Sequence, residues 1–187
     1  FKAVTITPAS SGRPGPGAFE GASDYPAHRA WWGYHPKLRE IGKAWAKATL
    51  THVNAYTGKR LIDEPAVAML MLVNEQSVFF DWKEPQKPTP PAIRALFAQL
   101  YNAWLVKEYK NRAGLEKAWL EPGGKTVLGA DEDPSKGTVS CWDLYASILG
   151  QNAPVGGSGK QAAVRVKTLV RFLKALQKEC YADYLAF

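Results

Sequence analysis

The chain contains few of the residues that build metal centres or disulfide frameworks. Its 187 residues include two cysteines, Cys141 and Cys180, and three histidines. Two cysteines permit one disulfide bond but do not specify one. The sequence has no Cys-x-x-Cys motif and no cluster of histidines, which are the usual sources of zinc ligands. We therefore expect no metal site and no cofactor.

Long apolar runs are also missing. No stretch reaches the roughly 20 apolar residues of a membrane-spanning helix, so we expect no membrane partner. No signal peptide is visible either, but the first residue is Phe1 rather than Met. We expect the natural amino terminus to be missing, and localisation and oligomeric state are left open.

Charge of one sign is in excess. The chain has 24 Lys and Arg against 17 Asp and Glu, a net charge of +7, which could indicate a nucleic-acid partner. A series of charges on an amphipathic helix is more often a solvated face. We therefore expect no nucleic-acid partner, and expect the basic residues of two predicted helices to be exposed: Lys37, Arg39, Lys43, Lys47, Arg165, Lys167, Arg171, Lys174 and Lys178.

The most informative stretch is Ala66–Val73, eight consecutive apolar residues. The run is too short to span a membrane and shows no polar alternation, which is typical of a parallel strand buried on both faces. Pro65 is tolerated at the start of such a strand, because the first residue need not donate to the ladder. The run predicts a central strand of an α/β fold.

Polar residues bound this predicted strand on both sides. Asn74, Glu75 and Gln76 follow it, and Asp63 and Glu64 precede it. In an α/β barrel the chemistry lies at the carboxyl ends of the strands, and the opposite face contributes stability. We therefore place Asn74 and Glu75 at the mouth of a site, and Asp63 and Glu64 at the bottom face.

The remaining pattern alternates strand and helix. A β-branched alternation predicts a first strand within residues 1–9, and a Gly- and Pro-rich loop spans 9–35. In that loop Trp31 and Trp32 either line a cleft or cover the core. Apolar spacing predicts helices over residues 36–53, 93–109, 115–119 and 161–186, and one short helix around 142–149 within an irregular segment from 121 to 160.

The first predicted helix has one apolar face. Its members recur at three- and four-residue steps: Leu38, Ile41, Trp45, Ala48 and His52. We expect His52 to be a core or capping histidine rather than a catalytic one.

Three segments together resemble the region around the fourth barrel strand of clan A glycoside hydrolases, the group that includes cellulases and mannanases. They are the Asp-Glu-Pro-Ala-Val start of the strand with its Asn-Glu end (63–75), the preceding Leu-Thr-His-Val-Asn-Ala-Tyr-Thr-Gly segment (50–58), and the Trp-Leu-x-x-x-Tyr and Leu-x-x-Ala-Trp helical pattern (102–109 and 115–119). The resemblance covers residues 36–119 well.

The resemblance implies a partial (β/α)8 TIM barrel in which the two parallel strands are the third and fourth, with flanking helices and long loops. A complete barrel needs about 250 residues. We therefore expect residues 1–187 to form a single incomplete catalytic domain, a fragment of a longer chain.

The resemblance also implies a carbohydrate substrate and retaining hydrolysis of O-glycosidic bonds in poly- or oligosaccharides. Glu75 would be the general acid/base, and Asn74 would bind the sugar 2-hydroxyl. Gln76, Trp82 and Trp32 are the other substrate-binding candidates, with packing as the alternative role of both tryptophans. Retention requires a second carboxyl group about 5–5.5 Å away. In this family that group follows the seventh strand, which lies outside this chain, so we expect the chain alone to be inactive.

Two other functions stay open at this point. A catalytically inactive relative could keep the aromatic cleft and bind carbohydrate only. A basic nucleic-acid-binding domain has weak support from the charge, and no motif agrees with it.

Overall fold

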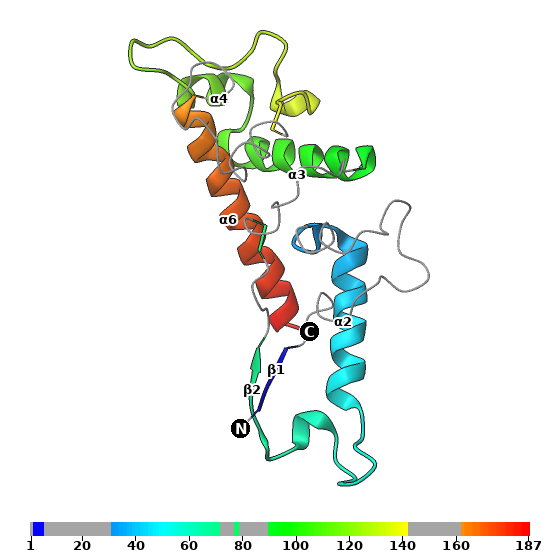
Figure 1. The fold of residues 1–187 in the computed structure, drawn as a ribbon. Coiled ribbons are helices and arrows are strands. Elements are labelled where there is room, and N and C mark those ends of the chain that lie inside the picture. The colour runs from blue at the N-terminus through cyan, green and yellow to red at the C-terminus, as the bar shows by residue number, and fades with distance from the viewer. Residues whose placement is uncertain (1, 6–30, 72–76, 79–89, 142–161) are drawn as a thin grey trace. The chain divides into compact units, whose positions relative to one another are not determined.

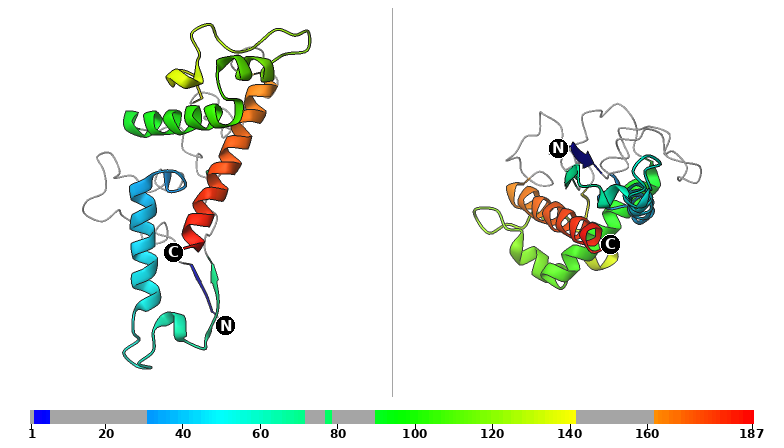
Figure 2. Two further views of the ribbon diagram at one scale, coloured as in Figure 1. Left: turned by 180° about the vertical axis from the view of Figure 1, so that it is seen from behind. Right: turned by 90° about the horizontal axis from the view of Figure 1, so that it is seen from below.

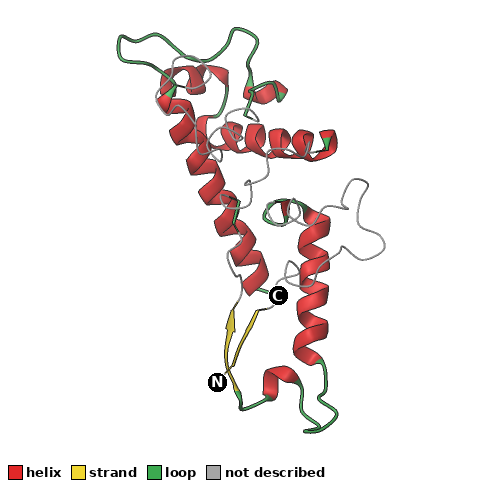
Figure 3. Cartoon of the chain, viewed as in Figure 1, coloured by secondary structure: helices red, strands yellow, loops and turns green. Residues whose placement is uncertain are grey.

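The computed structural model describes residues 2–5, 31–71, 77–78, 90–141 and 162–187. Helices dominate this part of the chain (Figure 3). Contacts divide the protein into two units: Phe1–Asp81 with Glu179–Phe187 form unit 1, and Trp82–Lys178 form unit 2. The last helix, α6 (Ala163–Leu185), contributes residues to both units.

Unit 1 contains a β-α-β unit. Strands β1 (Lys2–Thr5) and β2 (Val67–Met71) pair in parallel, with a register irregularity between Lys2 and Ala3. Helix α2 (Pro36–Thr51) lies between them in the chain. The two strands run side by side in both side-on views (Figures 1 and 2). The predicted pair of parallel strands is confirmed; the barrel around them stays a prediction.

The predicted burial of the central strand is wrong for β2. Met69 is 63% exposed and Leu70 is 38% exposed. Because neighbouring side chains of a strand point to opposite faces, both faces of β2 are open here. A sheet of two described strands gives β2 one neighbour, so apolar character alone does not bury it.

Helix α2 begins at Pro36, whose fixed φ suits the first helical turn, and ends at the C-cap residue His52. Its buried residues are Leu38, Gly42 and Ala46, so of the predicted apolar face only Leu38 is buried. The four-residue spacing of these three residues places them on a single face, on which Gly42 and Ala46 are small. That face allows a close neighbour, whereas the bulky face with Ile41 and Trp45 stays partly exposed.

Ion pairs beside this face connect α2 to the end of α6. Arg39 contacts Glu179 at 3.3 Å, and Lys43 contacts Asp183 at 2.8 Å. The hydrogen bonds that Lys43 donates to the carboxylates of Asp183 and Glu40 raise the pKa of Lys43. These pairs fix which side of α2 turns inward.

Unit 2 is built on three helices: α3 (Pro91–Tyr109), α4 (Arg112–Ala118) and the first part of α6. Phe172 of α6 packs against Phe97 and Tyr101 with ring centroids 5.6 and 5.2 Å apart, in edge-to-face geometry. Such aromatic contacts add about 0.5–1.5 kcal/mol to area burial. The helices predicted at 93–109, 115–119 and 161–186 are confirmed, with first residues shifted by two or three positions and last residues by at most one.

A buried ion pair joins α6 to the irregular segment that follows α4. The guanidinium of Arg165 contacts the carboxylate of Glu132 through two bonds of 2.6 and 2.8 Å, and the two residues are 1% and 3% exposed. Arg165 therefore does not lie on a solvated face, and that prediction is wrong. The reason is local: Arg165 also lies over the Trp119 ring at 4.6 Å and donates to the carbonyl of Ser140.

The carboxylate of Glu132 also has backbone partners. The N–H groups of Gly129 and Ser140 donate to it at 2.8 and 3.0 Å. Burial by itself raises the pKa of Glu132, but the bonds from Arg165 and these N–H groups outweigh it and lower the pKa to about 2. The two charges thus pair directly with each other, and the carboxylate has backbone donors as well, whereas the Nε of Arg165 has no hydrogen-bond partner among the described residues.

Replacement of one partner tests this pair. We expect Glu132→Gln to lower the free energy of unfolding by about 3–5 kcal/mol, because Arg165 stays buried without a countercharge. The matched control is Glu108→Gln, which breaks the exposed Arg171–Glu108 pair and should cost about 0–1 kcal/mol. Urea unfolding measures both, and equal losses would contradict the assignment.

The same pair predicts an acid-sensitive stability. The folded-state pKa of Glu132 lies below its ordinary value, so the contribution is complete above about pH 5 and is lost as pH falls towards 2. We expect the wild-type chain to lose on the order of 2–3 kcal/mol over this range through Glu132. The measurement compares the pH dependence of unfolding in wild type and Glu132→Gln. An equal slope in both would show that Glu132 is not the titrating group.

Candidate functional site

The residues predicted to be catalytic follow strand β2 in the chain. β2 ends at Met71, three positions before Asn74. Asn74, Glu75, Gln76 and Trp82 lie outside the described residues. Thr5 of β1 pairs with Met71, so the carboxyl ends of both strands lie at one edge of the sheet. The chain leaves the described part of unit 1 at this edge, where parallel α/β folds place their chemistry.

Trp32 is the predicted binding residue that the structure does describe, and it is 4% exposed. Its ring packs edge-to-face against Tyr184 of α6, with centroids 5.2 Å apart. Trp31 is buried as well. The two tryptophans therefore take the role of covering the core of unit 1, and the structure does not present Trp32 as a stacking surface for a sugar.

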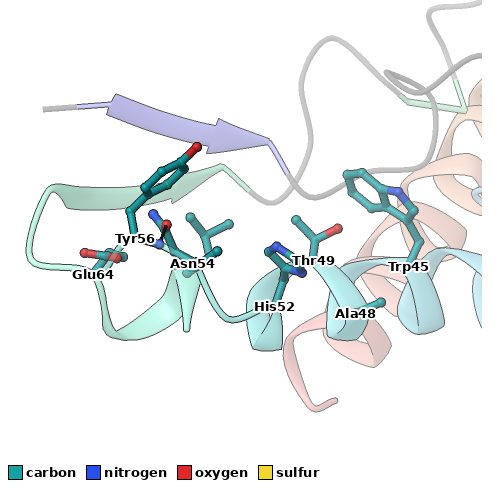
Figure 4. Close-up of a pocket in the computed structure, with 9 residues that line it drawn as sticks. Trp45, Ala48, Thr49, His52, Asn54, Tyr56 and Glu64 are labelled. Carbon is teal, nitrogen blue, oxygen red and sulfur yellow. Dashed lines mark hydrogen bonds between the residues drawn. The ribbon is translucent and has the colours of Figure 1, made fainter. Parts of the chain in front are cut away.

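Unit 1 also contains a pocket of about 670 Å³, here called the α2 pocket, at the carboxyl end of α2 and before the start of β2 (Figure 4). Trp45, Thr49 and His52 project from the same side of the helix end. Tyr56 comes from the turn that follows, and Glu64 from the segment that leads into β2. The volume lies within the range of about 300–1,000 Å³ that is typical of small-molecule sites.

Local backbone geometry forms the wall of this pocket. The N–H of Gly58 donates to the carbonyl of Asn54 at 2.8 Å, and Gly58 has a φ of 67°, which favours glycine. The side-chain oxygen of Asn54 accepts from the N–H of Tyr56 at 2.9 Å. This turn holds Tyr56 on the surface, where it is 99% exposed.

Two acidic residues precede β2 in the chain, and they differ in their surroundings; their place at the bottom face of a barrel stays a prediction. Asp63 accepts two hydrogen bonds from Arg60, which lower its pKa. Glu64 lines the α2 pocket and accepts a hydrogen bond from the Thr57 hydroxyl. Among the described residues, only Thr57 donates to the carboxylate of Glu64, so one of its oxygens faces no protein donor.

His52 is neither a core residue nor an obvious catalytic one. It is exposed and is the C-cap residue of α2, with its backbone N–H donating to the carbonyl of Thr49. Its carbonyl accepts from the N–H of Leu61 at 3.1 Å. The predicted capping role of His52 is confirmed, and the backbone of the residue performs it. The ring of His52 lines the α2 pocket.

Sequence reasoning did not find the α2 pocket. The seven-residue step from Trp45 to His52 is typical of a core-facing stripe, and it indicates that both residues lie on one side of the helix. The contribution of Tyr56 and Glu64 depends on a turn and a short 3-10 helix, Leu61–Asp63, that bring separate segments together. No periodic pattern in the sequence predicts that this turn and 3-10 helix bring the two residues to the pocket.

No group of three or more His, Cys, Asp or Glu side chains in the described part of the chain could hold a metal ion. Within the same ranges, no helix combines the length and apolar character that crossing a membrane requires. Comparison with protein-family models, with curated proteins and with solved structures gave no match.

The burial of Trp32 leads to a stability prediction. We expect Trp32→Ala to lower the free energy of unfolding by about 3–5 kcal/mol, because it empties a packed space beside Tyr184. Tyr56→Ala is the control, since an exposed ring contributes within about 0.5 kcal/mol. Thermal or urea unfolding checks both. If Trp32→Ala had as small an effect as the control, its ring would be available to a ligand.

Proposed function

We propose that the protein is a retaining glycoside hydrolase of the clan A type, with Glu75 as general acid/base and Asn74 as the residue that binds the sugar 2-hydroxyl. The observation that carries the proposal is the parallel pairing of β1 and β2, after which the chain continues directly into Asn74 and Glu75. A strand, a helix and a parallel strand are the repeating unit of α/β barrels and also of doubly wound sheets. The Asn-Glu pair and its two flanking segments favour the barrel.

The proposal does not use burial of β2, since Met69 and Leu70 are exposed. It is based on the direction of β2, which runs parallel to β1 and leads towards Asn74 and Glu75 in the sequence. The carboxyl end of a parallel strand is where a side chain can project towards a ligand rather than into the layer beneath, and Glu75 follows that end within four residues of Met71.

The chemistry assigned to Glu75 has two steps. Its carboxyl group first protonates the oxygen of the departing sugar, and the resulting carboxylate then takes a proton from the water that releases the glycosyl-enzyme intermediate. The nucleophile of the first step is a second carboxylate, expected outside this sequence. The acid role needs a carboxyl group that is still protonated near the working pH.

The test uses the complete natural protein that carries this sequence. We expect Glu75→Gln to lower kcat/KM for substrates with poor leaving groups by roughly 10²–10⁴-fold, since general acid catalysis is lost. Aryl glycosides with good leaving groups need no proton and should lose much less in the first step. Azide should restore turnover of these activated substrates, because it attacks the intermediate without a general base.

The control for this experiment is Asp63→Asn, which removes an exposed carboxylate at the other end of β2 and should leave the rate unchanged. An unchanged rate in Glu75→Gln would refute the assignment of Glu75. Binding of oligosaccharides by the wild-type protein without any turnover would favour the inactive carbohydrate-binding relative instead.

A further inference from the structure

We propose that the α2 pocket is a second ligand site and that its ligand is a neutral saccharide. The pocket lies at the amino end of β2, where Leu61 and Glu64 precede the strand. Asn74 and Glu75 follow the carboxyl end of the same strand in the sequence. The inference rests on the chemistry of the pocket itself and does not depend on the proposed catalytic role of Glu75.

The first argument is the apolar part of the wall. Trp45 stands on α2 and Tyr56 on the following turn, and the pocket is lined between them by small and aliphatic side chains such as Ala48 and Leu61. A sugar ring carries one face of C–H groups that packs on an aromatic ring. Aromatic side chains on such a wall provide apolar area together with a polar edge, the indole N–H of Trp45 and the hydroxyl of Tyr56.

The second argument is the polar part of the wall. The ring of His52, the side-chain NH₂ of Asn54 and the second carboxylate oxygen of Glu64 form no hydrogen bond with other described residues, although all three residues line the pocket. Together they offer both donors and acceptors. Sugar hydroxyl groups also donate and accept, so one ligand could pair with all three.

The third argument is charge, which separates a neutral ligand from an ion. Among the described residues, no Lys or Arg lines the α2 pocket, and Arg60, next to Leu61 in the chain, is paired with Asp63, so a phosphate or carboxylate ligand would find no cation among them. In the part of the chain that the structure describes, Glu64 is the one carboxylate that lines the pocket. A small cation would find that carboxylate but would also meet the field of a chain with a net charge of +7. A neutral polyol needs no cation in the pocket and is not repelled by the positive net charge of the chain.

The experiment measures binding by NMR on the ¹⁵N-labelled complete protein in a Glu75→Gln background, which separates binding from turnover. The probes are neutral tetrasaccharides of glucose, mannose and xylose, with choline as the cationic probe and inorganic phosphate as the anionic probe. We expect at least one tetrasaccharide to shift the amide resonances of residues 45–64, and we expect no such shift from choline or phosphate.

Two variants locate the site. Tyr56→Ala and His52→Ala change exposed side chains, so the fold should be kept. Each should raise the dissociation constant for the tetrasaccharide roughly threefold to tenfold, through loss of one aromatic face or one hydrogen-bonding ring. Phe187→Ala is the matched control, because Phe187 is a half-exposed aromatic residue of unit 1 outside the pocket.

Unchanged dissociation constants in both pocket variants would overturn the inference, and so would resonance shifts caused only by choline or only by phosphate. The outcome is independent of catalysis. Failure of the Glu75 assignment would leave the pocket result intact.

Discussion

The ion pair of Arg165 and Glu132 is the interaction on which unit 2 depends. Two opposite charges are removed from water, which costs several kcal/mol for each ion, and their mutual attraction and further hydrogen bonds offset this cost. The carboxylate is held by a bidentate guanidinium and two backbone N–H groups, and the guanidinium by two carbonyls and an indole face. The pair therefore constrains geometry more than it adds net stability.

That constraint explains how an irregular segment keeps a defined path. Glu132 lies between Gly129 and Ser140, in a stretch with little regular secondary structure, so its backbone groups need partners other than a helix or sheet. Arg165 supplies donors to the carbonyls of Val127 and Ser140. The side chain of Asn102, on α3, bonds to the backbone of Val139. Its NH₂ group donates to the Val139 carbonyl, and its oxygen accepts from the Val139 N–H. Side chains from two helices thus replace the ladder that the segment lacks.

In unit 1 the organising feature is different. The polar residues of the Asp63–Gln76 stretch form two groups, one before the amino end of β2 and one after its carboxyl end. Glu64 precedes β2 and lines the α2 pocket, whereas Asn74 and Glu75 come after the strand. The proposed catalytic role and the proposed saccharide pocket therefore belong to opposite ends of one short strand, and they can be tested separately.

The elements of secondary structure could be predicted because their signals are local. Pro36 begins a helix, apolar residues repeat every three or four positions over 93–109, and β-branched or apolar runs mark β1 and β2. Burial was harder to predict. Ala66–Val73 reads as a buried strand, yet Met69 and Leu70 are exposed, and Arg165 reads as a surface charge, yet it is enclosed.

What the sequence determined by itself is thus the order of helices and strands and the placement of Asn74 and Glu75 after a strand. What only the tertiary structure decided is which faces are covered, where Trp32 packs, which charge is buried, and that Trp45, His52, Tyr56 and Glu64 share a pocket. The physical reason is the separation along the chain between the residues that interact. Helix and strand signals come from neighbours a few positions apart, whereas burial and pockets depend on segments distant in the chain, such as residues 132 and 165.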